Sequence, residues 1–145
     1  MIDENKLKHI IGVARLMKEK AYVLGLDETK MFTLGMVHDI GFEFGTSEEH
    51  HEIGYLILKN QGYEYALEVL YHGKPTDEYV SDALDLLNFA DMHIDKKGNY
   101  VAFEERLEDI KARRGVDSPH YQNCKRVIEN LISRHPELCE NESQK

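Results

Sequence analysis

The chain has 145 residues, of which 41% are hydrophobic, and it carries a formal net charge of −9. This length suits a single domain with one core. The acidic balance argues against a protein that binds DNA or RNA through a basic face, although a buried metal ion could still attract a small anionic substrate.

The cysteines and the N-terminus bear on where such a chain would work. Cys124 and Cys139 lie 15 positions apart without a CxxC pair, which indicates neither a disulfide framework nor a zinc ribbon. The stretch MIDENKLKHI lacks the pattern of a secretion signal, and no apolar run approaches the roughly 20 residues of a membrane-spanning helix. We therefore expect a cytoplasmic protein that is not inserted in a membrane.

Apolar residues recur at spacings of three and four throughout the chain, which predicts an all-α fold, a compact bundle of about six to seven helices. The first helix is expected over residues 6–22 and is broken by Gly25. Asp27 is a candidate N-cap for the second helix, which should run to Asp39 and stop at Gly41.

The middle of the chain supplies the third, fourth and fifth predicted helices. The third opens in GTSEEHHEIGYLIL, where Thr46 and Glu49 have the spacing of a capping box. Its core face is expected to carry three apolar residues, Ile53, Leu56 and Ile57. The fourth helix is expected over residues 63–72 and the fifth over residues 77–92.

The last two helices follow a polar turn, DKKGNY. The sixth is expected over residues 103–114. Ser118 is a candidate N-cap for the seventh, whose first residue is a proline and which should end at Pro136. Residues 137–145 are expected to form a disordered tail.

Several polar residues fall on the apolar faces of these helices. His38 lies four residues after Leu34 and Asp91 lies four residues after Leu87, so both should point toward the core. An unpaired buried carboxylate is costly, so Asp91 should have a cationic partner or a metal ion. His50 and His72 also share a face with apolar residues of their helices, and His9 lies at the edge of the apolar face of the first helix.

Imidazole and carboxylate groups together suit iron, manganese, zinc or cobalt. In a helical bundle, a metal site is usually built from side chains that point inward from facing helices. The sequence therefore predicts a metal site in the core, to which five of the helices contribute one or two ligands each.

The order of these residues resembles the H…HD…D signature of the HD-domain superfamily of metal-dependent phosphohydrolases. The signature residues would be His9, His38, Asp39 and Asp91. VHDIG matches the HDIG form of the central motif, and HHEIGYLIL, VLYHG and NFADMHID resemble the helices that follow it in the family. The resemblance covers residues 6–95 and implies one HD-type domain over residues 1–136, with helices at 103–135 completing it.

The same resemblance implies a ligand set. Four residues would bind a first metal: His9, His38, Asp39 and Asp91. His50 and His72 would complete a second metal site, with Asp39 bridging, or would contact substrate. His51 competes with His50 for this place, and could instead support a ligand by hydrogen bonding. The cofactor would be one or two divalent metals, among Fe, Mn, Co, Zn, Ni and Mg.

One position departs from the family pattern. Many hydrolytic members carry lysine directly after HDIG, whereas this chain has Phe42. Candidates to supply the missing polar group are Glu43 and, as phosphate-binding residues, Lys74 and Arg106.

The resemblance implies a hydrolase that cleaves a nucleotide or another small phosphate ester with a metal-activated water, with Asp39 at the catalytic centre. The partner would be a small phosphorylated molecule, not a nucleic acid polymer or a membrane, and the oligomeric state is left open. Two alternatives use the same residues: a di-iron oxygenase of the HD fold, and a non-catalytic signalling or interaction domain that a metal stabilises.

Overall fold

The computed structural model describes residues 2–44 and 50–143, without the side chains of 140–143. This part of the chain forms eight α-helices and two short 3₁₀ helices, and contains no strand beyond an isolated bridge between Ile94 and Tyr100. The prediction of an all-α fold is therefore confirmed. None of the described helices has the length and apolar character needed to cross a membrane.

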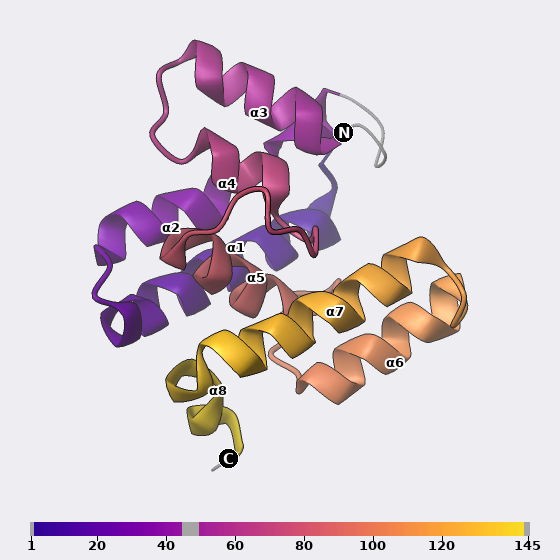
Figure 1. The fold of residues 1–145 in the computed structure, drawn as a ribbon. Coiled ribbons are helices and arrows are strands. Elements are labelled where there is room, and N and C mark those ends of the chain that lie inside the picture. Colours follow the sequence, from indigo (N-terminus) through magenta and orange to yellow (C-terminus); the bar gives the residue numbers. More distant parts are fainter. Residues whose placement is uncertain (1, 45–49, 144–145) are drawn as a thin grey trace.

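Helix α5 (Asp82–His93) lies at the centre of the bundle (Figure 1). Ten of its twelve residues are buried, among them Leu86, Leu87 and Phe89. Helices α1 (Glu4–Lys20) and α4 (Ala66–Tyr71) pack against it, as does α7 (Pro119–Arg134). A polar side chain near the end of α5 is therefore held in the middle of the protein.

Helix α2 (Glu28–Val37) begins where it was predicted, because the Asp27 side chain accepts a hydrogen bond from the Lys30 backbone N–H. It ends two residues before Asp39, and a 3₁₀ helix, η2 (Ile40–Glu43), follows. The prediction that Gly41 stops α2 is wrong. A Cβ atom at Gly41 would collide with the backbone carbonyl of His50, so this glycine instead allows α3 to start against the turn.

Helix α3 (His50–Asn60) turns a different face inward from the one predicted. The buried residues are His50, Gly54 and Leu58, while Leu56 is 55% exposed. Gly54 approaches the Val69 side chain on α4, so the small residue lets the two helices pack closely. The predicted capping box at Thr46 and Glu49 lies outside the described residues.

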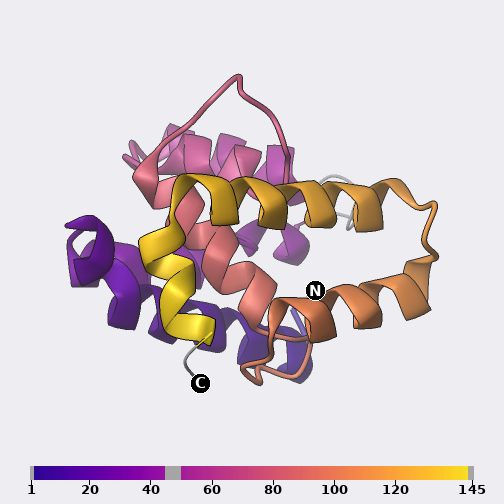
Figure 2. The same cartoon turned by 60° about the horizontal axis from the view of Figure 1, so that its bottom comes forward.

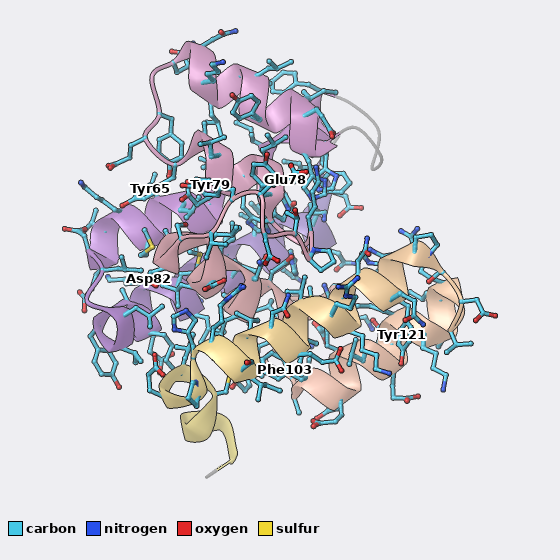
Figure 3. The ribbon with its side chains drawn as sticks, viewed as in Figure 1. Tyr65, Glu78, Tyr79, Asp82, Phe103 and Tyr121 are labelled. Atoms are coloured by element: carbon cyan, nitrogen blue, oxygen red, sulfur yellow. The ribbon has the colours of Figure 1, made fainter. Side chains whose placement is uncertain are left out.

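Helix α5 begins at Asp82, five residues later than predicted. The reason is that the Ser81 side chain accepts a hydrogen bond from the Leu84 N–H and caps the helix there. The segment before it crosses between α4 and α5 and carries Tyr79 (Figure 3). Tyr79 and Ser81 both donate to the buried carboxylate of Glu68 on α4, at 2.6 and 2.7 Å, which fixes this segment.

The C-terminal helices pack as a hairpin beside α5 (Figures 1 and 2). Helix α6 (Phe103–Arg114) has its predicted bounds, and the Ser118 side chain caps α7 as expected. The predicted disordered tail needs correction, because Pro136 opens a further helix, α8 (Pro136–Ser143). Leu138 on α8 is fully buried, so α8 belongs to the packed domain.

Candidate metal centre

The predicted ligands come from five parts of the fold and meet at one buried place. His9 lies on α1, and His38 and Asp39 form the turn after α2. His50 begins α3 and His72 ends α4. Asp91 lies in the last turn of α5. All of these residues are buried except Asp91, whose side chain is 13% exposed.

Asp91 is the meeting point of two histidines. Its Oδ1 atom lies 2.8 Å from His9 Nε2 and 3.7 Å from His38 Nε2. These ring nitrogens and the carboxylate oxygen fall within 4.8 Å of one another, which is close enough for one ion to contact all three.

Asp39 is the meeting point of three histidines. Its Oδ2 atom lies 3.1 Å from His38 Nε2, and its Oδ1 atom lies 3.2 Å from His72 Nε2. His50 Nε2 is 3.4 Å from the same Oδ1 atom. Since His38 faces both carboxylates, Asp39 and Asp91 flank one shared imidazole.

The far side of three of these rings is held by the backbone. His9 Nδ1 lies 2.9 Å from the Asp95 carbonyl, His38 Nδ1 2.7 Å from Gly35 and His72 Nδ1 2.6 Å from Val69. A carbonyl oxygen can only accept, so each Nδ1 carries a proton and donates it. In the neutral rings, each Nε2 therefore presents a lone pair toward the carboxylates.

This arrangement requires a cation. A lone pair on Nε2 and a carboxylate oxygen are both acceptors, and His38 Nε2 is buried with no hydrogen-bond partner in the described part of the chain. Buried acceptors that face one another are stable only if a proton or a metal ion lies between them. The donor set of imidazoles and carboxylates fits Fe, Mn, Co, Zn or Ni.

Without a metal, protons take this place. Burial disfavours the charged form of His38, but Asp39 and Asp91 outweigh it and raise the pKa of the ring to about 10. Burial also opposes the charged form of the two carboxylates, yet the neighbouring histidines, with His38 foremost, hold the pKa of each well below its usual range. A divalent metal would have to displace the proton from His38.

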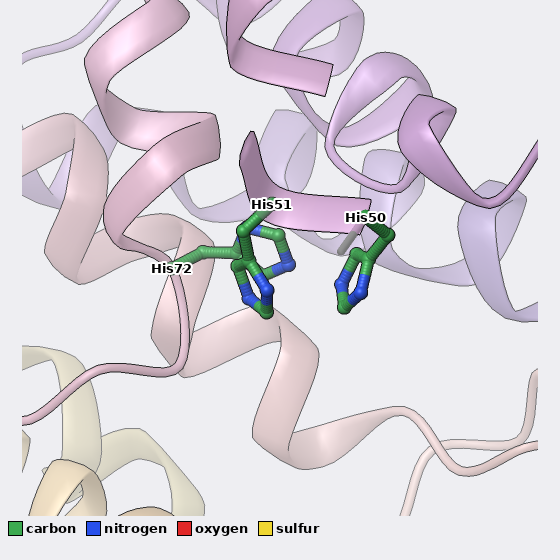
Figure 4. Close-up of side chains that lie close together, drawn as sticks. All are labelled: His50, His51 and His72. Carbon is green, nitrogen blue, oxygen red and sulfur yellow. The ribbon is translucent and has the colours of Figure 1, made fainter. Parts of the chain in front are cut away.

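His51 lies beside this group without the same contact to Asp39. Its ring packs 4.2 Å from His72 and 3.9 Å from His50, measured between centroids (Figure 4). Burial, followed by the charges of His72, His50 and Lys74, lowers its pKa to about 2. His51 is therefore a neutral imidazole, and His50 is the α3 histidine whose ring nitrogen reaches Asp39.

The predicted phosphate-binding residues lie around the centre. Lys74 is partly exposed and pairs with Glu52 at 3.5 Å, at the start of α3. Arg106 is buried, and its Nε donates to the backbone carbonyl of Asp91 at 3.4 Å. The Glu43 carboxylate accepts a hydrogen bond from the Ile2 backbone N–H at 3.1 Å, near the N-terminus of the chain.

A further cation was missed in the sequence. Lys6 Nζ on α1 lies 3.2 Å from Asp39 Oδ2 and 3.9 Å from the centroid of the Phe42 ring. The Phe42 ring in turn stacks on His50, with centroids 4.0 Å apart and an interplanar angle of 22°. The available signal was its spacing, because Lys6 precedes His9 by three residues and so shares its face of the helix.

The chain is thus an all-α protein whose core holds a buried cluster of histidines and aspartates that could bind metal. The family model described as HD domain matches residues 7–143. The chain belongs to the HD domain family, which consists largely of metal-dependent phosphohydrolases. No solved structure matches the chain at a significant level.

Proposed function

We propose that this protein is a metal-dependent phosphohydrolase that acts on a nucleotide or another small phosphate ester. One observation carries the proposal. Three imidazoles donate their Nδ1 protons to backbone carbonyls and turn their Nε2 atoms toward Asp39 and Asp91. Fixing the tautomer in this way is how proteins prepare histidines to bind metal.

The residues suggest two metal positions that share Asp39. His9, His38, Asp39 and Asp91 would hold the first metal. His50 and His72 would complete the second, because both lie within 3.4 Å of Asp39 Oδ1. When bound, a divalent metal acidifies a water to give a nucleophile and neutralises charge on the phosphate oxygens.

The chain itself contributes orientation and exclusion of solvent. The backbone carbonyls of Gly35, Val69 and Asp95 fix three rings in place. The burial of His38 and Asp39 keeps bulk water away from the shared carboxylate. Local electrostatic interactions are stronger in such a low-dielectric site, which favours binding of a compact anion there.

The charge of the protein supports a small substrate. A net charge of −9 would repel a nucleic acid polymer, whereas a nucleotide needs only the local positive charge of the metals and nearby lysines. The test is phosphate release from a panel of nucleotides and other phosphate esters, with Mn, Fe, Co, Zn, Ni or Mg supplied separately. Release with at least one metal is expected, and no release with any of them would refute the proposal.

A second candidate is an oxygenase that uses two irons at the same residues. The observation that favours it is Phe42, an uncharged residue where hydrolytic relatives often carry lysine. Oxygen consumption by the iron-loaded protein distinguishes the two functions. Consumption coupled to oxidation of an organic substrate, without phosphate release from the panel, would replace the first proposal by the second.

A further inference from the structure

The position of Lys6 is unusual for a surface lysine. Its side chain is 28% exposed, yet its ammonium reaches the 5% exposed carboxylate of Asp39 at 3.2 Å. The Asp3 side chain accepts from the Lys6 backbone N–H at 2.8 Å and fixes the first turn of α1. Lys6 therefore extends from an ordered helix start into the edge of the candidate metal centre.

The Phe42 ring also contacts this ammonium. The aromatic face is negative, so a cation 3.9 Å from the ring centroid is attracted to it. The same ring stacks on His50, which lies 3.4 Å from Asp39. The Phe42 ring thus connects Lys6 with His50. Phe42 is uncharged, but it contacts the positive charge that Lys6 on α1 provides.

We propose that Lys6 is a phosphate-binding residue that positions the substrate, and that Phe42 positions Lys6. This inference rests on the proposed function and names the residue that would hold the phosphoryl group beside the metals. An ammonium has three N–H donors, and the contact with Asp39 Oδ2 uses one of them. A metal ion bound to Asp39 would compete for the same carboxylate, which leaves the ammonium free to donate to a phosphate oxygen.

A different role would use the same contact. Lys6 could serve only as the counterion that neutralises Asp39 before metal binds. In that case its removal would strengthen metal binding, because a competing cation is lost, and would leave phosphate binding unchanged. The two roles therefore differ in a measurement that does not depend on turnover.

The experiment compares Lys6→Gln with Lys8→Gln in metal-loaded protein. Lys8 lies on the same helix and pairs with exposed Glu4, so its substitution makes the same change in net charge away from the centre. Inorganic phosphate is titrated calorimetrically into each protein, and bound metal is measured in parallel. Lys6→Gln should weaken phosphate binding by about tenfold or more, the usual effect of losing a charged hydrogen bond, with unchanged metal content. Lys8→Gln should match the wild type.

Two further variants test the contact between Lys6 and Phe42. Lys6→Arg keeps the charge and should retain most of the phosphate affinity. Phe42→Leu removes the aromatic face and should weaken phosphate binding by roughly two- to fivefold. Circular dichroism establishes that each variant is folded.

The outcomes separate this inference from the proposed function. Equal phosphate affinity in wild type and Lys6→Gln would overturn the inference and assign Lys6 the counterion role. No phosphate binding by the metal-loaded wild type would also overturn it. If phosphate binds through Lys6 but no ester in the panel is hydrolysed, the proposed function fails and the inference stands.

Discussion

Asp39 and His72, separated by 33 positions in the sequence, meet at 3.2 Å between Oδ1 and Nε2 in the core of the protein. The contact exists because the Val69 carbonyl holds the opposite edge of the His72 ring at 2.6 Å. The same construction recurs at His9 and His38, with different carbonyls. Two of these carbonyls, of Gly35 and Val69, lie in the last turns of α2 and α4, where backbone acceptors lack helical partners, and the third, of Asp95, lies just after α5.

The two proposed metal positions can be counted separately. Of the two carboxylates, the His9 ring contacts Asp91 and the His72 ring contacts Asp39. The substitutions His9→Ala and His72→Ala therefore each remove one ring from a different position. In a protein that binds two metals, each variant should lose about one equivalent, because the other position keeps most of its ligands. Metal content after gel filtration provides the measurement. Loss of both metals in His72→Ala, or of neither, would contradict the division into two positions.

Close backbone packing at Gly41 is predicted to be essential for stability. Gly41→Ala should lower the free energy of unfolding by about 3 kcal/mol or more, because the new Cβ meets the rigid backbone of His50. Gly54→Ala is the matched control, since its Cβ would meet the movable Val69 side chain at 3.2 Å. Urea unfolding of both variants gives the comparison. Equal losses would show that the approach of α3 to the turn is not tight.

Helix α8 should contribute measurably to stability. Leu138→Ala should cost about 2 kcal/mol of unfolding free energy, because a fully buried leucine is truncated. Ile132→Ala on α7, where the side chain is 51% exposed, should change it by less than about 0.5 kcal/mol. If Leu138→Ala is equally silent in denaturant unfolding, α8 does not pack on the domain in solution.

We predict that His135, between α7 and α8, makes the stability of the protein depend on pH independently of the metal centre. Burial opposes the charged form of His135, but hydrogen bonds to Glu137 and Asp85 outweigh it and raise its pKa above 6.5. A base whose pKa is raised on folding stabilises the protein fully below the unfolded pKa of 6.5, and this contribution is lost as pH rises through the folded value.

The test for His135 is a comparison of His135→Gln with the wild type across this range. Urea unfolding at about pH 5.5 and pH 9 should show the larger deficit of the variant at the lower pH. The same deficit at both pH values, or a larger one at pH 9, would contradict the ion pairs of His135 with Asp85 and Glu137.

The sequence predicted the helices best where their ends are set locally. The bounds of α6 and the Ser118 cap of α7 are correct, because each depends on residues within one turn. The end of α2 was predicted too late. No residue next to Val37 is a helix terminator. The helix ends there because Asp39 contacts His72 after α4 and His38 contacts Asp91 on α5.

The candidate centre was predictable as a set of residues but not as a geometry. Helical spacing and the family motifs indicated which histidines and aspartates point inward. Helical spacing placed Lys6 on the same face of its helix as His9, but it did not show that Lys6 contacts Asp39 and Phe42, which lie more than 30 positions away. The inward face of α3 was also misread, since Gly54 faces the core through close packing and not through hydrophobicity.

The central claim is that the carboxylate of Asp39 holds metal. The most direct test is elemental analysis of anaerobically purified wild type, Asp39→Asn and Asp85→Asn. Asp85 is also a buried carboxylate, but it pairs with Arg134 at 2.7 Å and with His135, so it controls for burial. We predict one or two equivalents of a divalent transition metal in the wild type and in Asp85→Asn, and almost none in Asp39→Asn with its helical content retained. Unchanged metal in Asp39→Asn, or a wild type that binds none, would contradict the account.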